Sequence, residues 1–158
     1  MTYKELKERQ QKEVNDFPFG FAFSNEQFDE MMNEWGLDSK NDLNKIVSIG
    51  AGGFVQKKDL NAMHEMFDRH SQELKDLRKN IKEMQEAFFY QMCNHEYGIN
   101  LQRDYDVLSC FGNINYHGDN INELEMYFDE LGFDDDLRQA YKKASKKYYK
   151  LALENEWF

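Results

Sequence analysis

One short segment of the chain brings together residue types that can carry out chemistry. The segment comprises Cys93, Asn94, His95, Glu96, Tyr97 and Gly98. A cysteine, a histidine and a carboxylate are the components of a thiol nucleophile with its base and orienting acid. Residues two positions apart on a helix point in different directions, however, so Cys93 and His95 would not contact each other there. Either a distant residue completes a dyad, or the segment only ends a helix, with Gly98 taking the left-handed C-terminal cap.

The histidines and cysteines do not have the spacing of a metal site. Zinc ligands usually occur in pairs such as C-x-x-C or H-x-x-x-H, whereas His64 and His70 lie on different faces of a predicted helix. The metalloprotease motif H-E-x-x-H is also absent from the sequence. We therefore expect no metal, no cofactor and no catalytic residues in this chain.

The distribution of charge indicates a binding surface. Between Gly98 and Asp136 there are ten acidic residues and one basic residue, Arg103. The candidate acidic surface consists of Glu123, Glu125, Asp129, Glu130, Asp134, Asp135 and Asp136. Closely spaced carboxylates can imitate the phosphates of nucleic acid and compete for a basic groove. The alternative is that the final segment, which contains Arg138 and five lysines, lies against these acids and neutralises them.

The charge and hydropathy of the whole chain restrict its partners and its location. A formal net charge of -10 at pH 7 should repel nucleic acid and anionic membranes, so a protein partner is expected to be basic. No stretch approaches the roughly 20 apolar residues of a membrane span. The start, MTYKELKERQQKEV, lacks the apolar core of a signal peptide, and two cysteines are too few for a disulfide scaffold. These features favour a cytoplasmic location.

The elements that must position these residues begin with a helix and a small sheet. A thin apolar stripe predicts a helix over residues 3–15, and the period-two pattern FPFGFAF predicts a strand over residues 17–23. Two β-rich runs at residues 45–49 and 54–57 flank GAGG, which predicts a hairpin that joins this strand in an antiparallel sheet. A phosphate-binding loop is the alternative, but GAGG does not lead into Gly-Lys-Ser/Thr.

A second helix has sequence signals at both of its ends. Ser24 and Gln27 have the spacing of a capping box, in which the hydroxyl accepts a backbone N–H and the glutamine side chain reaches back. Gly36 follows the last apolar residue and can take the left-handed conformation that ends a helix. We therefore predict a helix between Ser24 and Gly36.

The longest predicted element is one central helix from Asp59 to about Tyr97. Its apolar positions recur in alternating steps of three and four, which is typical of a coiled coil or of a helix buried along one side. This seam consists of Leu60, Met63, Phe67, His70, Leu74, Leu77, Ile81, Met84, Phe88 and Met92. Such a helix would be on the order of 55 Å long, so it could protrude, bend or pair with a second copy. The polar His70 either sets the register of such a pair or has a partner within the fold.

The rest of the chain is predicted to form shorter helices. They occupy residues 103–111, 121–132 and 134–158, and acidic residues open the last one at its positive dipole end. The fold class is therefore α+β and predominantly helical, with about three short strands near the N-terminus. We expect a single domain of residues 1–158, with an α/β lobe, the long helix and a helical lobe possible at residues 1–58, 59–97 and 98–158.

Three segments of the chain resemble a group of small uncharacterised proteins of phages and mobile elements in low-GC Gram-positive bacteria. They are FAFSNEQF, IGAGGFVQKKD and FFYQMCNHEYGINLQRDYDVLSCFG. The resemblance covers roughly Phe19 to Gly112. That group has no established activity, so Asn94, His95, Glu96 and Tyr97 carry over as signature residues without a role.

The resemblance implies a biological setting for the acidic surface. Small acidic proteins of phages and mobile elements often bind and block host machinery, including CRISPR nucleases and other defence enzymes. We therefore expect a non-enzymatic inhibitor of a host nucleic-acid-binding protein, acting in the cytoplasm of a bacterial host. The alternative is an interaction or adaptor module that forms a homodimer through the seam from Leu60 to Met92.

Overall fold

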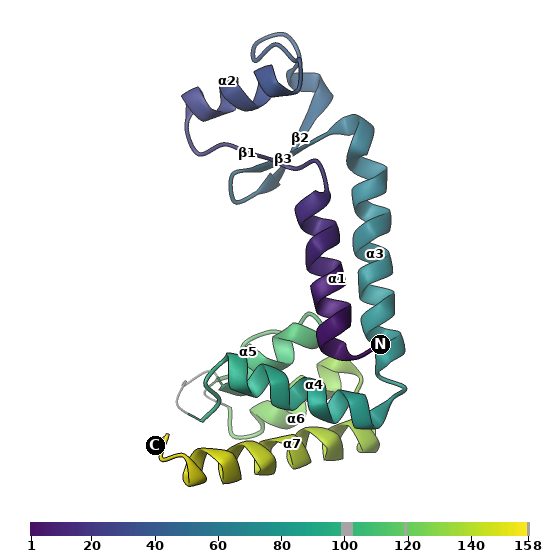
Figure 1. The fold of residues 1–158 in the computed structure, drawn as a ribbon, viewed down its shortest axis with the longest axis vertical. Coiled ribbons are helices and arrows are strands. Elements are labelled where there is room, and N and C mark those ends of the chain that lie inside the picture. Colours follow the sequence, from purple (N-terminus) through teal and green to yellow (C-terminus); the bar gives the residue numbers. More distant parts are fainter. Residues whose placement is uncertain (99–102, 119, 158) are drawn as a thin grey trace. The chain divides into compact units, whose positions relative to one another are not determined.

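The computed structural model describes residues 1–98, 103–118 and 120–157. The chain divides into two compact units, which we call unit 1 (Met1–Lys7 and Glu73–Phe158) and unit 2 (Glu8–Gln72). Figure 1 shows the elements of both units in sequence colours. Helices predominate, and one small antiparallel sheet lies near the N-terminus, as the sequence predicts. Helices α1 (Tyr3–Asp16) and α3 (Leu60–Leu77) contribute residues to both units, and each unit is described separately.

The sheet of unit 2 has three strands in the order β1-β3-β2, and both pairings are antiparallel. The strands are β1 (Gly20–Phe21), β2 (Ile46–Gly50) and β3 (Gly53–Gln56). The predicted hairpin is confirmed: β2 and β3 are joined by Ala51 and Gly52, whose φ angles are 51° and 76°. Short 3-10 turns flank the hairpin at Leu43–Lys45 and Lys57–Asp59.

The strand predicted over residues 17–23 is much shorter than expected. Only Gly20 and Phe21 pair with β3. The N–H of Phe19 donates to the carbonyl of Phe17 at 2.8 Å, and Pro18 has no N–H to offer a neighbouring strand. This local turn leaves two residues extended, although the period-two pattern continues on both sides.

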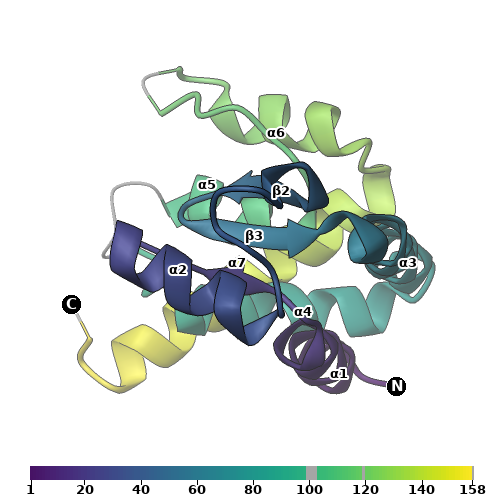
Figure 2. The ribbon, with the colours of Figure 1, turned by 90° about the horizontal axis from the view of Figure 1, so that it is seen from above.

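Helix α2 (Asn25–Glu34) has the predicted ends and covers the sheet (Figures 1 and 2). The hydroxyl of Ser24 accepts the N–H of Gln27 at 3.2 Å, and the Gln27 side chain accepts the N–H of Phe23 at 2.9 Å. At the other end Gly36 has a φ of 69°. The helix approaches β1 so closely that a Cβ on Gly20 would lie 2.5 Å from the Met31 sulfur. Only glycine fits at this contact.

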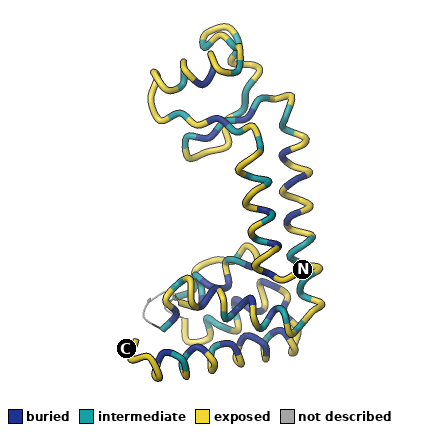
Figure 3. The backbone as a smooth tube through the Cα atoms, viewed as in Figure 1, coloured by how far each residue is buried: buried dark blue, intermediate teal, exposed yellow. Residues whose placement is uncertain are grey.

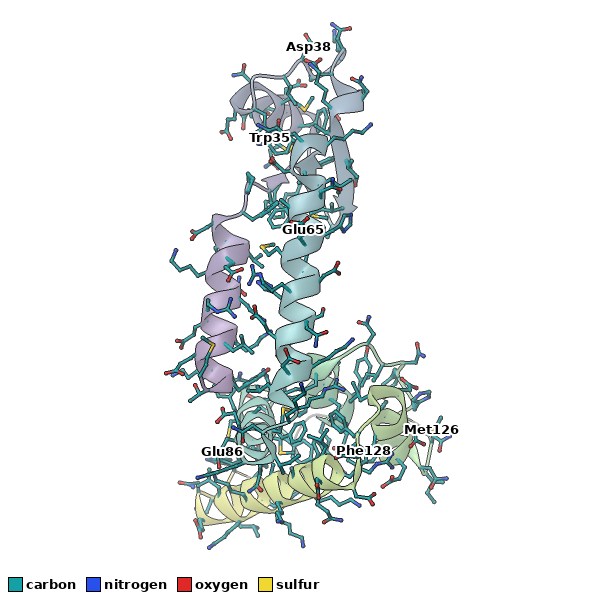
Figure 4. All side chains as sticks on the ribbon, turned by 90° about the vertical axis from the view of Figure 1, so that its right-hand side faces the viewer. Trp35, Asp38, Glu65, Glu86, Met126 and Phe128 are labelled. Atoms are coloured by element: carbon teal, nitrogen blue, oxygen red, sulfur yellow. The ribbon has the colours of Figure 1, made fainter. Side chains whose placement is uncertain are left out.

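Helices α1 (Tyr3–Asp16) and α3 (Leu60–Leu77) lie side by side (Figures 1 and 4). In unit 2 the carboxylate of Glu13 pairs with Arg69 and, at 3.0 Å, with the ring of His70. The side chain of Gln10 donates to the His70 carbonyl at 3.2 Å. His70 is 7% exposed and has partners within the chain, so the interpretation as a satisfied core histidine is correct.

The prediction of one helix from Asp59 to about Tyr97 is wrong. Helix α3 ends at Leu77, and a separate helix α4 (Ile81–Asn94) begins four residues later. The N–H of Asn80 donates to the Leu77 carbonyl at 2.9 Å, three residues back, so the α-helical pattern stops there. Asn80 then caps α4, because its side chain accepts the N–H of Glu83 at 3.1 Å.

A tertiary contact in unit 1 stabilises this break. The guanidinium of Arg78 donates to the carbonyl of Phe111 at 2.6 Å and to that of Leu131 at 2.7 Å. It also lies over the ring of Phe133, 5.1 Å from its centroid. These contacts hold Arg78 against the ends of the 3-10 turn Ser109–Phe111 and of the helix Glu123–Leu131. The periodicity of the seam shows neither the cap nor these contacts, so it overestimates the length of the helix.

Unit 1 consists of helices around a core rich in aromatic residues. Besides α4, its elements are α5 (Arg103–Leu108), the 3-10 turn Ser109–Phe111, α6 (Glu123–Leu131) and α7 (Asp135–Glu154), near the predicted positions. Helices α4 and α7 pack along each other. Their buried faces meet at Phe88 and Tyr141, whose rings contact edge-on, and the ring of Phe128 on α6 is also edge-on to that of Tyr141. Figure 3 shows buried positions along α4 and α7.

Candidate functional site

The ring of His95 contacts Cys110 rather than its sequence neighbour Cys93. His95 is the C-cap of α4, and its N–H donates to the carbonyl of Gln91 at 3.0 Å. Its Nε2 atom lies 3.5 Å from the sulfur of Cys110, which belongs to the 3-10 turn after α5. The fold therefore supplies the distant partner that a thiol–imidazole dyad needs.

The chemistry around Cys110 does not favour a nucleophile. Burial raises the pKa of the Cys110 thiol, and the positive charge of Lys7 opposes only part of this effect. The thiol also lies 3.4 Å from the carbonyl of Asp106, as a donor to it. A nucleophilic cysteine needs a stabilised thiolate and an oriented base. Among the described residues no carboxylate is hydrogen-bonded to the His95 ring, so the pair resembles a packing contact.

Tyr97 belongs to a buried polar cluster. Its hydroxyl donates to a carboxylate oxygen of Asp104 at 2.9 Å, and the hydroxyl of Tyr141 donates to the same oxygen at 2.6 Å. The Ser145 hydroxyl donates to Tyr97 at 3.3 Å. Burial, followed by the negative charge of Asp104, raises the pKa of both tyrosines well above its usual value. A buried carboxylate needs such donors, so Tyr97 ties the end of α4 to α5 and α7.

Glu96 has a structural role that was expected of Gly98. Its φ is 50°, in the left-handed region, and the next residue, Tyr97, donates its N–H to the Met92 carbonyl at 3.0 Å. This is the Schellman ending of a helix, with a glutamate where glycine is usual. Gly98 also has a positive φ, 92°, but it lies two residues beyond the cap. The prediction that Gly98 supplies the cap is therefore wrong by two positions.

The four signature residues act together to end α4. The side chain of Asn94 reaches back to that of Gln91 at 3.5 Å, while the next three residues contact Cys110, form the left-handed turn and reach Asp104. The structure thus brings together residues of α4, α5 and α7 in one helix-terminating arrangement. It does not assemble a catalytic triad from them among the described residues.

Part of the acidic surface is paired with the basic helix that follows it. Arg138 on α7 donates to Glu125 at 2.7 Å and to Asp129 at 2.8 Å. Lys142 lies 3.8 Å from Glu125. These contacts are the neutralisation that the alternative interpretation of the charge pattern predicts, and they are confined to one side of α6.

Other members of the acidic surface hold local structure. Glu130 pairs with the ring of His117 and accepts the N–H of Asn115 at 2.8 Å, and these hydrogen bonds lower its pKa. Asp134 is the N-cap of α7 and accepts the N–H of Leu137 at 2.9 Å. The remaining members, Glu123, Asp135 and Asp136, lie in the first turns of α6 and α7.

A pocket in unit 1 involves residues that the sequence analysis did not select. It has a volume of about 450 Å³ and lies between the start of α1 and one side of α4. Its apolar lining includes Tyr3, Ala87, Phe89 and Tyr90, and the exposed Cys93 stands at its rim. Phe89 and Tyr90 do not belong to the seam. Two adjacent aromatic residues outside the buried face of a helix are the feature of the sequence that could have indicated this pocket. Tyr3 could not have been connected with them, because it is distant in sequence.

Comparison with known proteins identifies a family but no activity. A family model described as a family of unknown function (DUF7659) matches residues 2–147. No curated protein matches the chain, and no solved structure does. None of the helices in the described residues has the length and apolar character needed to cross a membrane.

Proposed function

The chain belongs to this family of unknown function, DUF7659, and we propose that it acts by binding a basic protein partner rather than by catalysis. The observation that carries the proposal is the group of exposed carboxylates at the start of α7. Asp134, Asp135 and Asp136 are consecutive and exposed, and the carboxylates of α6 precede them in the chain. A positively charged groove would gain favourable electrostatic contacts from this group.

The geometry explains why these charges are available to a partner. Ion pairs with Arg138 engage Glu125 and Asp129, but Asp135 and Asp136 make no ion pair with any described residue. Both lie in the first turn of a helix, where the dipole favours negative charge. The net charge of -10 adds a long-range attraction for a basic molecule.

The partner that we propose is a nucleic-acid-binding protein of a bacterial host, such as a defence nuclease. Its groove is built to bind phosphates, and closely spaced carboxylates can occupy it in their place. The resemblance to phage and mobile-element proteins supports an anti-defence role of the anti-CRISPR type. In this proposal the protein acts in the host cytoplasm as an inhibitor and does not itself bind nucleic acid.

The state of the cysteines supports a binding role over an enzymatic one. Burial raises the pKa of Cys93 as well as that of Cys110, which disfavours the thiolate form of both. The contact between His95 and Cys110 is 3.5 Å long, and the described part of the chain supplies no carboxylate to orient the imidazole. These features fit structural thiols better than catalytic ones.

A homodimer through the seam is less favoured by the packing. The seam residues Met63 and His70 are buried in unit 2, and Met84, Phe88 and Met92 are buried in the core of unit 1. Pairing two copies through these residues would require opening both units. Sedimentation equilibrium measures this alternative directly, since a monomer at high protein concentration contradicts it.

The test of the proposal reverses charge at the start of α7. We expect Asp135→Lys combined with Asp136→Lys to weaken binding to a candidate host nuclease at least tenfold, as measured by calorimetry. The matched control is Glu26→Lys combined with Asp29→Lys on α2, which changes the net charge equally at exposed positions in unit 2. Equal weakening by both pairs would indicate a general effect of net charge rather than this surface.

A second measurement examines the imitation of nucleic acid. DNA should compete with the protein for the nuclease, because both occupy the same basic groove. If the nuclease binds DNA and the protein at the same time, with unchanged affinity for each, the imitation mechanism is wrong. Binding that depends on Asp135 and Asp136 without this competition would leave a protein-binding role and exclude the groove as its target.

A further inference from the structure

The pocket beside α4 combines an aromatic lining with carboxylates. Its floor includes the ring of Tyr3, which is 1% exposed, and the ring of Tyr90 stands edge-on to it at 6.0 Å. Glu83 and Glu86 also line the pocket, and Figure 4 labels Glu86 on α4. A volume of about 450 Å³ is within the range of small-molecule sites and is larger than one side chain needs.

The chain itself shows which group these walls attract. The ammonium of Lys147 lies 4.1 Å from the ring centroid of Phe89 and 3.3 Å from the carboxylate of Glu86. A cation over an aromatic ring and beside a carboxylate is held by both the ring quadrupole and the ion pair. Phe89 and Glu86 both line the pocket. Tyr90 and Glu83 add a second aromatic ring and a second carboxylate to its lining.

We infer that this pocket receives a cationic side chain, arginine or lysine, from the basic partner. The inference rests on the proposed function, since it assigns part of that partner's recognition to a second place in unit 1. The aromatic rings would cover the alkyl stem or the guanidinium plane, and Glu86 would pair with the charge. Glu83 already accepts the N–H of Tyr3 at 2.6 Å, so the incoming cation would have to replace Lys147, whose exposed ammonium is paired with Glu86 at 3.3 Å.

Lys4 also lines the pocket, and the ammonium of Lys147 already lies at Glu86 and Phe89. Lys4 stands at the end formed by α1, together with Thr2. Glu86, Phe89 and Cys93 lie on α4. A cationic group is therefore expected to take the place of Lys147 at Glu86 and Phe89, away from Lys4, and Cys93 on the same helix can report its binding.

The experiment uses the alkylation of Cys93 as its readout. In the full chain carrying Cys110→Ser, N-acetyl-arginine amide should slow the reaction of Cys93 with N-ethylmaleimide by about twofold when half the pockets are filled. N-acetyl-lysine amide should act in the same direction. N-acetyl-citrulline amide has nearly the same shape as the arginine probe and no charge, so it should have little effect.

Two variants locate the effect in the pocket. Glu86→Gln and Tyr90→Ala should each abolish the slowing by the arginine probe. Their matched controls are Glu154→Gln, at an exposed acid on α7, and Tyr116→Ala, at an exposed tyrosine of unit 1 outside the pocket. Neither control should change the slowing by the arginine probe. Equal slowing by the citrulline and arginine probes, or no slowing by any probe, overturns the inference.

The outcome is separable from that of the proposed function, because no partner protein is present in the assay. If the arginine probe binds but the Asp135 and Asp136 variants bind a nuclease normally, the pocket assignment is supported and the proposed role of the acidic surface is contradicted. If those variants lose nuclease binding while the probe has no effect, the proposed role of the acidic surface is supported and the pocket assignment is contradicted.

Discussion

The imidazole of His95 lies 3.5 Å from the thiol of Cys110, fifteen residues further along the chain. The contact joins the C-cap of α4 to the 3-10 turn that follows α5. It gives the histidine at the C-cap of α4 a packing partner within unit 1. The thiol of Cys110 packs against the imidazole there.

The first prediction concerns the relative reactivity of the two thiols. Cys93 is exposed and Cys110 is partly buried, and burial raises the pKa of both, so Cys93 should be alkylated faster. Mass spectrometry of a time course with N-ethylmaleimide measures both rates. Faster reaction at Cys110, lost in His95→Gln, would instead reveal an activated dyad.

The second prediction concerns the left-handed glutamate that ends α4. Glu96→Gly should raise the free energy of unfolding by about 0.5–1 kcal/mol, because glycine adopts a φ of 50° without steric cost. Gly132→Ala, at the left-handed cap of α6, should lower it by about 1 kcal/mol. Urea denaturation measures both. A loss of stability in Glu96→Gly would mean that the glutamate side chain makes a compensating contact.

The third prediction concerns the buried carboxylate of Asp104. Asp104→Ala should cost about 2–4 kcal/mol, since it leaves the hydroxyls of Tyr97 and Tyr141 without their acceptor. Urea denaturation is again the measurement. Combining Asp104→Ala with Tyr97→Phe and Tyr141→Phe should recover part of the loss, and a purely additive loss would contradict the network.

The fourth prediction concerns acid stability in unit 2. Hydrogen bonds from Arg69 and His70 lower the pKa of Glu13 from 4.5 to about 2. A carboxylate with a lowered pKa stabilises the fold above about pH 4.5 and loses this contribution as the pH falls towards 2. The gap in urea midpoint between the wild type and Glu13→Gln should therefore shrink over that range.

The control for this pH series is Glu34→Gln, which removes an exposed carboxylate at the end of α2. Its urea midpoint should follow that of the wild type across the whole range. A gap for Glu13→Gln that stays constant from pH 6 to pH 2.5 would show that the carboxylate acts through packing rather than through its charge.

The fifth prediction concerns the break between α3 and α4. Asn80→Ala should lower the free energy of unfolding by about 1 kcal/mol, because it removes the side-chain acceptor for the N–H of Glu83. Asn80→Ser should retain most of the stability, since serine is also a good N-cap. If alanine stabilises the protein, the break is strained and α3 would continue into α4 without it.

Local interactions made much of this fold predictable from the sequence. Ser24, Gln27 and Gly36 define α2 through bonds between residues that are close in the chain, and glycines around Ala51 define the hairpin. The acids from Asp134 onwards likewise begin α7 where the sequence places them. In each case the residues that determine the element lie within a few positions of one another, so their types and spacing are sufficient.

Contacts between distant segments decided the rest. Whether the seam continues past Leu77 depends on Arg78 reaching the carbonyls of Phe111 and Leu131, and the role of Tyr97 depends on Asp104 and Tyr141. The pocket needs Tyr3 and α4 together. A sequence pattern records which residues can be buried, but it does not record which ones meet, because that is settled by the packing of helices far apart in the chain.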